Sequence, residues 1–413
     1  MRVYLRTFGC RANQYDSELV RARIEASGGI VVDDPSTADA AVFNSCAVTA
    51  EAEVELRKGI RGAARRNGSL RTVVMGCAAA LDRGDLRALP SVEQVVGGAD
   101  VDAVAMALGL SPTAIRPATQ HGTRALLRIQ DGCDEHCTFC ATTQARGDSR
   151  SRPADDIVRE AAALADHHAE IVLTGIHIGT WGRELDRTLG SLVARLVREV
   201  PAVRFRLTSV EATEVDDELA ELFGEPRRLA PHLHAPLQSG SDRVLRRMGR
   251  HWYTGATYAR AVERITRNRP VFALGADVIA GFPGESEPEH EATLSMVRNL
   301  PFTYLHVFPY SARPGTAATR LPDPVDTTVA RTRAKVLRAA GSDLARRYRA
   351  GRVGGGADVI VVRGDRREGL TEDYLDVELS PGLPRGTRFE ARLLAGPGRL
   401  TVQAPSQESR THR

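Results

Sequence analysis

A repeated alternation of strand-like and helix-like segments, from Arg124 to about Ser311, limits the central part of this chain to a parallel α/β fold. Short runs of apolar and β-branched residues are each followed by a longer segment with helical periodicity. The predicted strands are Arg124–Ile129, Glu170–Thr174, Arg204–Ser209, His232–Ala235, Gly275–Ala280 and Tyr304–Phe308. Six such units with right-handed crossovers predict a partial (β/α)6 barrel.

Residues 1–105 show the same alternation on a smaller scale. The predicted strands are Val3–Phe8, Ala38–Asn44, Arg71–Met75 and Val92–Val96, and the predicted helices are Asn13–Ser27 and Glu51–Asn67. This pattern predicts an N-terminal parallel α/β domain of the flavodoxin-like type.

The last part of the chain begins with a basic helix, predicted from Val325 to about Arg349. Its cationic side chains form either a solvated face or a face that contacts phosphates. Strand patterns at Asp358–Val362, Leu375–Leu379 and Arg388–Leu394 then predict a small β-barrel.

At 413 residues the chain is too long for a single core. We predict an N-terminal domain over 1–105, a linker over 106–123, the partial barrel over 124–345, the small β-barrel over 346–400 and a frayed tail over 401–413. No run approaches the ~18 apolar residues of a membrane span, so we expect no membrane partner and a cytoplasmic location. A net charge of +4 permits an anionic partner such as RNA without requiring one.

The six cysteines carry most of the functional information. Thiols stay free in a reducing compartment, so they are interpreted as metal or catalytic ligands before disulfides. Cys133, Cys137 and Cys140 form a C-x3-C-x2-C motif directly after the first predicted barrel strand. Three thiolates can hold three irons of a cubic iron–sulfur cluster and leave the fourth iron open to a substrate. A zinc site with His136 as fourth ligand is the alternative.

Cys10, Cys46 and Cys77 each fall one or two residues beyond a predicted strand of the N-terminal domain. The carboxyl ends of parallel strands share one edge of a sheet, so we expect these cysteines to converge there. They would form a second cluster site that is again one protein ligand short. The alternative is that each is a buried small apolar side chain.

Polar residues and glycines follow the other barrel strands and are predicted to contact a nucleotide-like cofactor at the same rim. They are Thr174, Gly175, Ser209, Glu211 and Gln238. Glycine lets the backbone approach a ligand, and Glu211 is suited to a cation or an ammonium group. For Gln238, a hydrogen-bonded loop amide is the alternative.

Together these motifs resemble the methylthiotransferase branch of the radical SAM enzymes, from about Met1 to about Gly396. The cysteine motif with the aromatic Phe139, which would lie at the cofactor, is the superfamily signature. The branch-specific segments are Thr7–Glu18, Asn44–Thr49, Gly76–Cys77, His232–Asp242, Asp277–Glu285 and Phe308–Thr316. The segment Glu368–Tyr374 resembles part of a TRAM domain, an RNA-binding module.

The resemblance implies two 4Fe–4S clusters. The C-x3-C-x2-C cysteines would hold the one that cleaves S-adenosylmethionine to a 5′-deoxyadenosyl radical. The three N-terminal cysteines would hold an auxiliary cluster that presents sulfur, and a second S-adenosylmethionine would donate the methyl group. The implied partners are a tRNA anticodon loop, an electron donor such as flavodoxin or ferredoxin, and a sulfur source.

Within the branch, Asn13–Glu18, Val48–Thr49, Thr174–Ile176 and Val307–Tyr310 look most like enzymes that act at C2 of threonylcarbamoyladenosine beside the tRNA anticodon. Enzymes acting on isopentenyladenosine, or on an aspartate of a ribosomal protein, are the alternatives. A non-catalytic zinc-bearing RNA-binding protein is an alternative of another class.

The chain departs from the family pattern at three places. Ala141–Thr143 stand where an Ile-Pro or Val-Pro pair is usual, Ala212 stands where proline is common, and Arg11 replaces a more usual lysine. These departures concern the shape of the cofactor rim and the substrate, not the cysteines.

Overall fold

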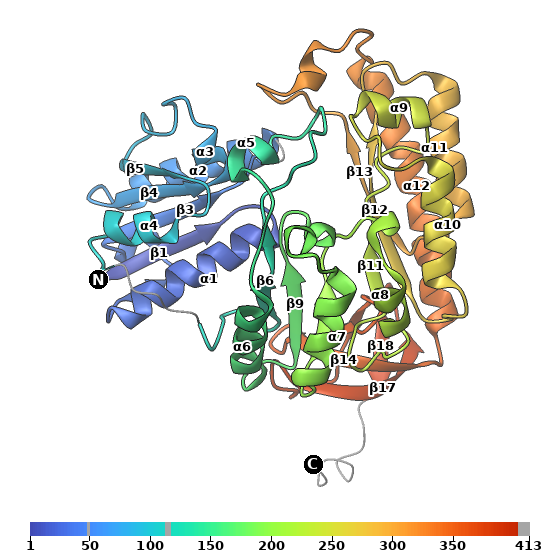
Figure 1. Ribbon diagram of the computed structural model, residues 1–413. Coiled ribbons are helices and arrows are strands. Elements are labelled where there is room, and N and C mark those ends of the chain that lie inside the picture. The colour runs from blue at the N-terminus through green and yellow to red at the C-terminus, as the bar shows by residue number, and fades with distance from the viewer. Residues whose placement is uncertain (48–49, 112–116, 404–413) are drawn as a thin grey trace.

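The computed structural model describes residues 1–47, 50–111 and 117–403, which form three parts in chain order (Figure 1). A parallel α/β domain stands beside a central domain of strands and helices, and a β-barrel, drawn in red, lies against one end of the central domain. The predicted fold class is confirmed. Val48–Thr49 and the end of the predicted tail lie outside the described residues. Among the residues described, no helix combines the length and the apolar character needed to cross a lipid bilayer.

The N-terminal sheet is parallel, with the flavodoxin-like strand order β2-β1-β3-β4-β5. The strands are β1 (Arg2–Thr7), β2 (Ile30–Val32), β3 (Ala40–Ser45), β4 (Arg71–Gly76) and β5 (Val92–Gly97), and the helices are α1 (Arg11–Ala26), α2 (Ala50–Arg66), α3 (Cys77–Ala80) and α4 (Val101–Ala107). Ala41 and Phe43 pack with α2, whereas Ala40 and Val42 pack with α1 and α4, because successive strand residues face opposite sides. The strand order reverses between β1 and β3, and such sheets bind ligands at this reversal.

Six parallel strands form the central partial barrel, with helices on their outer side. The strands are β6 (Ala125–Arg128), β9 (Glu170–Thr174), β10 (Arg204–Leu207), β11 (His232–His234), β12 (Ala273–Ala280) and β13 (Tyr304–Pro309). The helices are α6 (Ala154–Ala165), α7 (Leu189–Glu199), α8 (Asp217–Leu222), α9 (Asp242–Arg247), α10 (Gly255–Thr266) and α11 (Glu287–Asn299). A bridge between Ser209 and His234 joins two three-stranded halves. One continuous apolar core fills the space between strands and helices.

The C-terminal β-barrel is closed, with the strand order β14-β15-β16-β18-β17. Its strands are β14 (Gly356–Arg363), β15 (Glu368–Thr371), β16 (Asp376–Glu378), β17 (Arg388–Ala395) and β18 (Leu400–Gln403). The predicted small barrel is confirmed, although β15 and β18 were not predicted. The basic helix is α12 (Thr327–Arg352), which continues through the boundary predicted at 345/346. Arg333 pairs with Glu285 and Arg338 donates to the Val307 carbonyl, so part of its charge is used within the protein.

A buried ion cluster attaches this barrel to the central sheet. The side chains of Glu170, Arg204 and Arg206 are all 0% exposed. Arg204 donates to the carbonyl of Asp358 at 2.9 Å, and Arg206 donates to that of Thr371 at 3.1 Å. Burial alone would raise the pKa of Glu170, but the two guanidinium groups outweigh it and hold that pKa well below its usual range.

We expect Glu170→Gln to lower the free energy of unfolding by about 3–5 kcal/mol, because it leaves the buried Arg206 guanidinium without its carboxylate and leaves Arg204 with Asp358 alone, at 3.1 Å. Denaturant unfolding monitored by circular dichroism measures this change. Glu199→Gln, which removes a carboxylate from surface pairs with Arg195 and Arg198, is the matched control and should change stability by less than about 1 kcal/mol. Equal effects of the two substitutions would contradict this role of the cluster.

Candidate active site

The three N-terminal cysteines follow adjacent strands of one sheet. Cys10 lies between β1 and α1, Cys46 follows β3, and Cys77 begins α3 directly after β4. Gly9 has φ +102°, and a Cβ at this position would lie 2.7 Å from Cys46 Sγ. Glycine is therefore required here for Cys46 to approach the Cys10 loop.

Asn13 lies between two of these sulfurs. Its Oδ1 is 3.4 Å from Cys10 Sγ and 3.9 Å from Cys77 Sγ, so the two sulfurs are at most 7.3 Å apart, the sum of these distances. Its amide nitrogen donates to Asn44 Oδ1 at 3.0 Å and to the Ser45 carbonyl at 2.6 Å, which fixes the amide with its oxygen toward the sulfurs. The predicted convergence of these cysteines is therefore present in the structure.

The C-x3-C-x2-C cysteines lie on a loop that is held on two sides. Gly132 has φ +77°, and a Cβ there would lie 1.9 Å from the Asp148 carbonyl oxygen. The Cys133 amide donates to the Gly147 carbonyl at 3.0 Å, and the Thr138 amide donates to the Met248 carbonyl at 2.8 Å. The loop is thus fixed against both the segment after α5 (Thr142–Arg146) and the end of α9.

Each triad has one sulfur that faces a guanidinium group, and the two guanidinium groups belong to different arginines. Arg250 Nη1 lies 3.4 Å from Cys137 Sγ, and Arg146 Nε lies 3.4 Å from Cys77 Sγ. Burial raises the pKa of Cys137 to about 12 and that of Cys77 to about 11, although the neighbouring arginine opposes the shift in each case. These cationic donors favour the thiolate form that metal ligation needs.

Two further groups approach the barrel cysteines. His177 Nδ1 lies 3.6 Å from Cys133 Sγ, and its Nε2 lies 3.0 Å from Glu214 Oε2. Cys140 Sγ lies 3.1 Å from Thr142 Oγ1 and accepts from the Thr142 amide at 3.4 Å. The departure from the family pattern at Ala141–Thr143 therefore places a hydroxyl beside a cysteine sulfur.

The distances between possible ligand atoms bear on the choice between an iron–sulfur cluster and a zinc ion. In the parts of the chain that the structure describes, only His234, Asp277 and His306 form a set of three or more His, Cys, Asp or Glu side chains with all ligand atoms within 4.8 Å of one another. Ligands of one tetrahedral zinc ion lie within about 3.8 Å of one another. A cubic cluster spreads its ligands more widely, because each thiolate binds a different iron. His136 is exposed, and the barrel motif is not among the sets with closely spaced ligand atoms, which favours a cluster over a zinc ion at this motif.

The other predicted cofactor residues lie along the rim of the barrel but do not all face the triad. Glu211 accepts from Arg250 and from Trp252 Nε1, so one guanidinium group links it to Cys137. The ring of Phe139 packs edge-on against Phe282 in the core, with centroids 6.2 Å apart.

The remaining four differ in exposure. Thr174 is buried at the end of β9, and a Cβ on Gly175 would lie 2.5 Å from the Gln130 carbonyl. Ser209 is exposed. Gln238 is buried with φ +59°, and its backbone amide donates to the Asp277 carbonyl at 2.8 Å. Ligand roles for these residues stay predictions.

Gln130 is a structural residue of the site that sequence reasoning missed. Its Oε1 accepts from the amides of Ile176, at 3.2 Å, and His177, at 2.8 Å. Its amide nitrogen donates to the Gly132 carbonyl at 2.8 Å and to Ser149 Oγ at 2.9 Å. A polar residue directly after an apolar strand and before the cysteine motif was the available signal. Arg146 and Arg250, also missed, gave no such signal.

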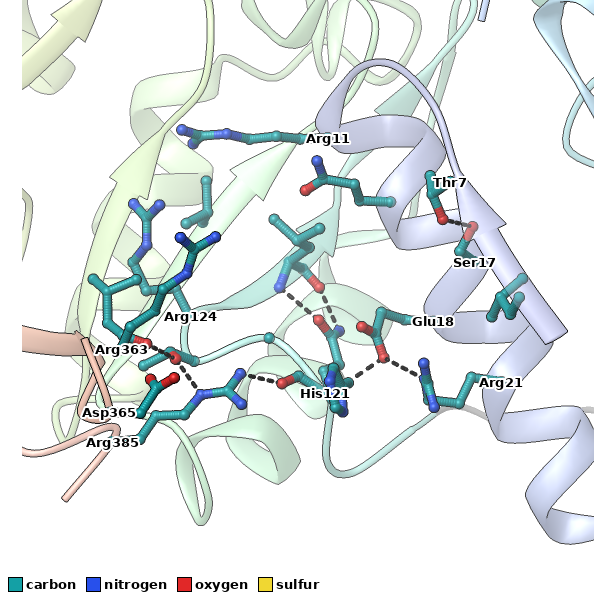
Figure 2. Close-up of a pocket in the computed structure, with 18 residues that line it drawn as sticks. Thr7, Arg11, Ser17, Glu18, Arg21, His121, Arg124, Arg363, Asp365 and Arg385 are labelled. Atoms are coloured by element: carbon teal, nitrogen blue, oxygen red, sulfur yellow. Dashed lines mark hydrogen bonds and ion pairs between the residues drawn. The ribbon is translucent and has the colours of Figure 1, made fainter. Parts of the chain in front are cut away.

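A separate cavity of about 600 Å³ lies where the three parts of the chain meet (Figure 2). Its charged lining is mostly cationic and consists of Arg11, Arg21, Arg124, Arg363, Arg385, Glu18 and Asp365. Arg385 donates to Thr123 Oγ1 and the His121 carbonyl, and Glu18 accepts from the His121 amide at 3.1 Å. Arg363 remains largely exposed, with 57% of its side chain accessible.

Two protein families match the chain. The Uncharacterized protein family UPF0004 matches residues 2–98, and the Radical SAM superfamily matches residues 127–297. The first match contains the three N-terminal cysteines and the second contains the C-x3-C-x2-C motif.

Curated relatives cover nearly the whole chain. A threonylcarbamoyladenosine tRNA methylthiotransferase MtaB of Rickettsia prowazekii is 33% identical, covering 95% of each protein. The enzyme of the same name from Bacillus subtilis is 36% identical, covering 84% of this chain and 81% of the relative. A tRNA-2-methylthio-N(6)-dimethylallyladenosine synthase of Sphingopyxis alaskensis is 33% identical, covering 97% of each.

Among solved structures, the radical S-adenosylmethionine methyltransferase TsrM from Kitasatospora setae, with cobalamin and a [4Fe-4S] cluster bound, has a similar fold. The TM-score is 0.58 at 16% identity, covering 77% of this chain and 76% of TsrM. The cobalamin-dependent radical enzyme OxsB has a TM-score of 0.51 at 11% identity, covering 84% of this chain and 56% of OxsB. At these identities the likeness concerns the fold alone.

We expect Gln130→Ala to loosen the rim of the barrel, because the amides of Ile176 and His177 lose their acceptor. Hydrogen exchange at these amides should accelerate at least about fivefold, equivalent to about 1 kcal/mol for one net hydrogen bond. Gln144→Ala, which removes a surface amide bonded to the Gly315 carbonyl at 3.3 Å, is the control and should leave both rates unchanged. Unchanged exchange in the Gln130 variant would show that another group holds this loop.

Proposed function

The chain belongs to the radical SAM methylthiotransferase family, and we propose that it inserts sulfur and a methyl group at C2 of threonylcarbamoyladenosine next to the tRNA anticodon. Membership makes it an enzyme of the methylthiotransferase type that uses S-adenosylmethionine and a 4Fe–4S cluster. The choice of nucleoside is supported by relatives named for threonylcarbamoyladenosine at 33–36% identity. Dimethylallyladenosine is the second candidate, favoured by the relative from Sphingopyxis alaskensis.

The observation that carries the proposal is the presence of two cysteine triads, with Arg146 from the segment after the barrel motif reaching Cys77 of the N-terminal triad. Cys133, Cys137 and Cys140 would hold the 4Fe–4S cluster, which with S-adenosylmethionine supplies one-electron chemistry that removes a hydrogen no side-chain base could take as a proton. Arg250 and the backbone amide of Thr142 donate to two of these sulfurs and favour their thiolate form. The interlocked loops around Gln130 hold the same triad against the rim.

We assign the auxiliary 4Fe–4S cluster to the N-terminal triad. Cys10 and Cys77 both lie beside Asn13 Oδ1, and Cys46 lies against Gly9, next to Cys10. The reaction also needs an electron donor, such as flavodoxin or ferredoxin, and a sulfur source. We place the enzyme in the cytoplasm, together with its tRNA substrate. The bases of an anticodon loop are single-stranded and can be turned outward toward a protein.

The test of the substrate is nucleoside mass spectrometry of tRNA from a strain that lacks this protein. Loss of the methylthio form of threonylcarbamoyladenosine, with the unmodified parent nucleoside accumulating, is the expected result. Loss of the methylthio form of dimethylallyladenosine would replace the first candidate by the second. An unchanged profile would refute both.

Cysteine substitutions should separate the two triads. We expect Cys137→Ala to abolish both 5′-deoxyadenosine formation and methylthiolation, because the cofactor-cleaving cluster loses a ligand. Cys46→Ala should abolish methylthiolation but retain 5′-deoxyadenosine formation, with iron falling from about eight to about four per chain. Iron and sulfide analysis and chromatography of the cleaved cofactor measure both effects. Full methylthiolation by the Cys46 variant would contradict the auxiliary cluster.

The cationic cavity at the junction of the three parts should contact the tRNA backbone. We expect Arg363→Ala to weaken tRNA binding about three- to tenfold and to reduce the slope of log K against log salt by nearly one, as for one lost phosphate contact. Formation of 5′-deoxyadenosine without tRNA should not change. Arg298→Ala on α11, also an exposed arginine, is the control. Equal salt slopes for both variants would place the tRNA elsewhere.

A further inference from the structure

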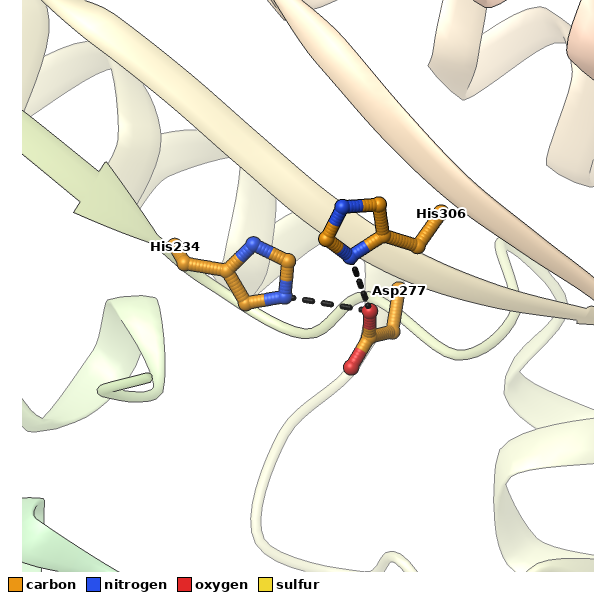
Figure 3. A group of neighbouring side chains, drawn as sticks. All are labelled: His234, Asp277 and His306. Atoms are coloured by element: carbon orange, nitrogen blue, oxygen red, sulfur yellow. Dashed lines mark hydrogen bonds and ion pairs between the residues drawn. The ribbon is translucent and has the colours of Figure 1, made fainter. Parts of the chain in front are cut away.

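Three side chains on neighbouring strands of the central domain point toward one another (Figure 3). His234 is the last residue of β11, Asp277 lies within β12, and His306 is paired with Asp277 on β13. Their neighbours along each strand belong to the core beneath the helices, so these three face the inside of the partial barrel. Within the described residues, none of the three forms a hydrogen bond with a cysteine.

The spacing of the ligand atoms fits one coordinated ion. Asp277 Oδ1 lies 3.1 Å from His234 Nε2 and 3.2 Å from His306 Nδ1. Ligands at about 2.1 Å from one ion are about 3.0 Å apart in an octahedral site and about 3.4 Å apart in a tetrahedral one. Charge-assisted hydrogen bonds between nitrogen and carboxylate are shorter, about 2.7–2.9 Å. The observed distances match the edges of a coordination polyhedron and lie at the long end of the range for hydrogen bonds.

A half-buried tyrosine, Tyr304, orients one of the histidines. Tyr304 OH lies 3.1 Å from His234 Nδ1 and 2.8 Å from His232 Nε2. Its hydroxyl can accept the Nδ1–H of His234 while donating to His232, which leaves the lone pair of His234 Nε2 directed at the centre of the trio. Metal-bound histidines are normally held in this way through their second ring nitrogen.

The site is partly open. The side chains are 10%, 29% and 56% exposed for His234, Asp277 and His306, so an ion has a route in. Two histidines and one carboxylate on one side of an ion form the facial arrangement that binds Fe(II), with other positions free.

We propose that His234, Asp277 and His306 bind a first-row divalent cation through Nε2, Oδ1 and Nδ1. The site is distinct from both cysteine triads and does not depend on the identity of the modified nucleoside. Three protein ligands leave coordination positions for water or for an oxygen-bearing ligand inside the barrel.

The test uses the full-length protein with its clusters reconstituted and Mn²⁺ as the probe. Mn²⁺ takes nitrogen and oxygen ligands and does not compete for thiolates that hold iron. Electron paramagnetic resonance of free Mn²⁺ during a titration should show one bound equivalent per chain. Asp277→Asn and His306→Ala should each weaken binding at least tenfold, while iron content stays unchanged.

His251→Ala, an exposed histidine on the loop after α9, is the matched control and should bind Mn²⁺ like the parent protein. His306 is more than half exposed, so its variant should keep the parent melting temperature, which circular dichroism checks. Absence of a bound equivalent in the parent protein, or unchanged binding in either ligand variant, would overturn the proposal.

Discussion

The relative position of the two cysteine triads depends on one buried arginine. Arg146 lies at the end of α5, shortly after the third barrel cysteine, and its side chain is 1% exposed. Its guanidinium group crosses into the N-terminal domain, where it donates to Asn13 at 3.0 Å and to Asp16 at 2.8 Å, and approaches Cys77. An unpaired buried charge costs several kcal/mol. The cysteine loop of the barrel is therefore stable in this conformation only with the N-terminal domain docked against it.

Arg146 can donate a hydrogen bond to a cysteine sulfur while it also pairs with carboxylates. Asp16 and Asp131 take the terminal nitrogens of Arg146 and leave Nε for Cys77. Arg250 repeats the pattern, with Glu211 as its carboxylate and Nη1 directed at Cys137. Hydrogen bonds to sulfur tune the reduction potential of bound iron. Each triad thus has a built-in donor, which a family resemblance based on cysteine spacing does not describe.

The sequence predicted what periodicity and chain direction determine. Parallel strands ending in cysteines located both triads, since carboxyl ends of parallel strands share an edge. It did not predict β2, which is an edge strand of three residues, or β15 and β18, which are four residues each. Contacts such as Arg146 with Asn13 join residues 133 positions apart and follow from the docking of two domains, not from any local pattern. The trio on β11, β12 and β13 depends on strand register, which a single sequence does not fix.

The C-terminal barrel reaches the inside of the central partial barrel through one aromatic side chain. Tyr374 stacks on His232, with ring centroids 4.4 Å apart, and lies near Tyr304; these are the first residues of β11 and β13. The cysteine loop instead follows the carboxyl end of the β6 strand. Arg11, next to Cys10, reaches Tyr374 OH at 3.0 Å across this interior and links the two ends. The C-terminal barrel is therefore in direct contact, through the Tyr374 side chain, with the loop that carries the first N-terminal cysteine.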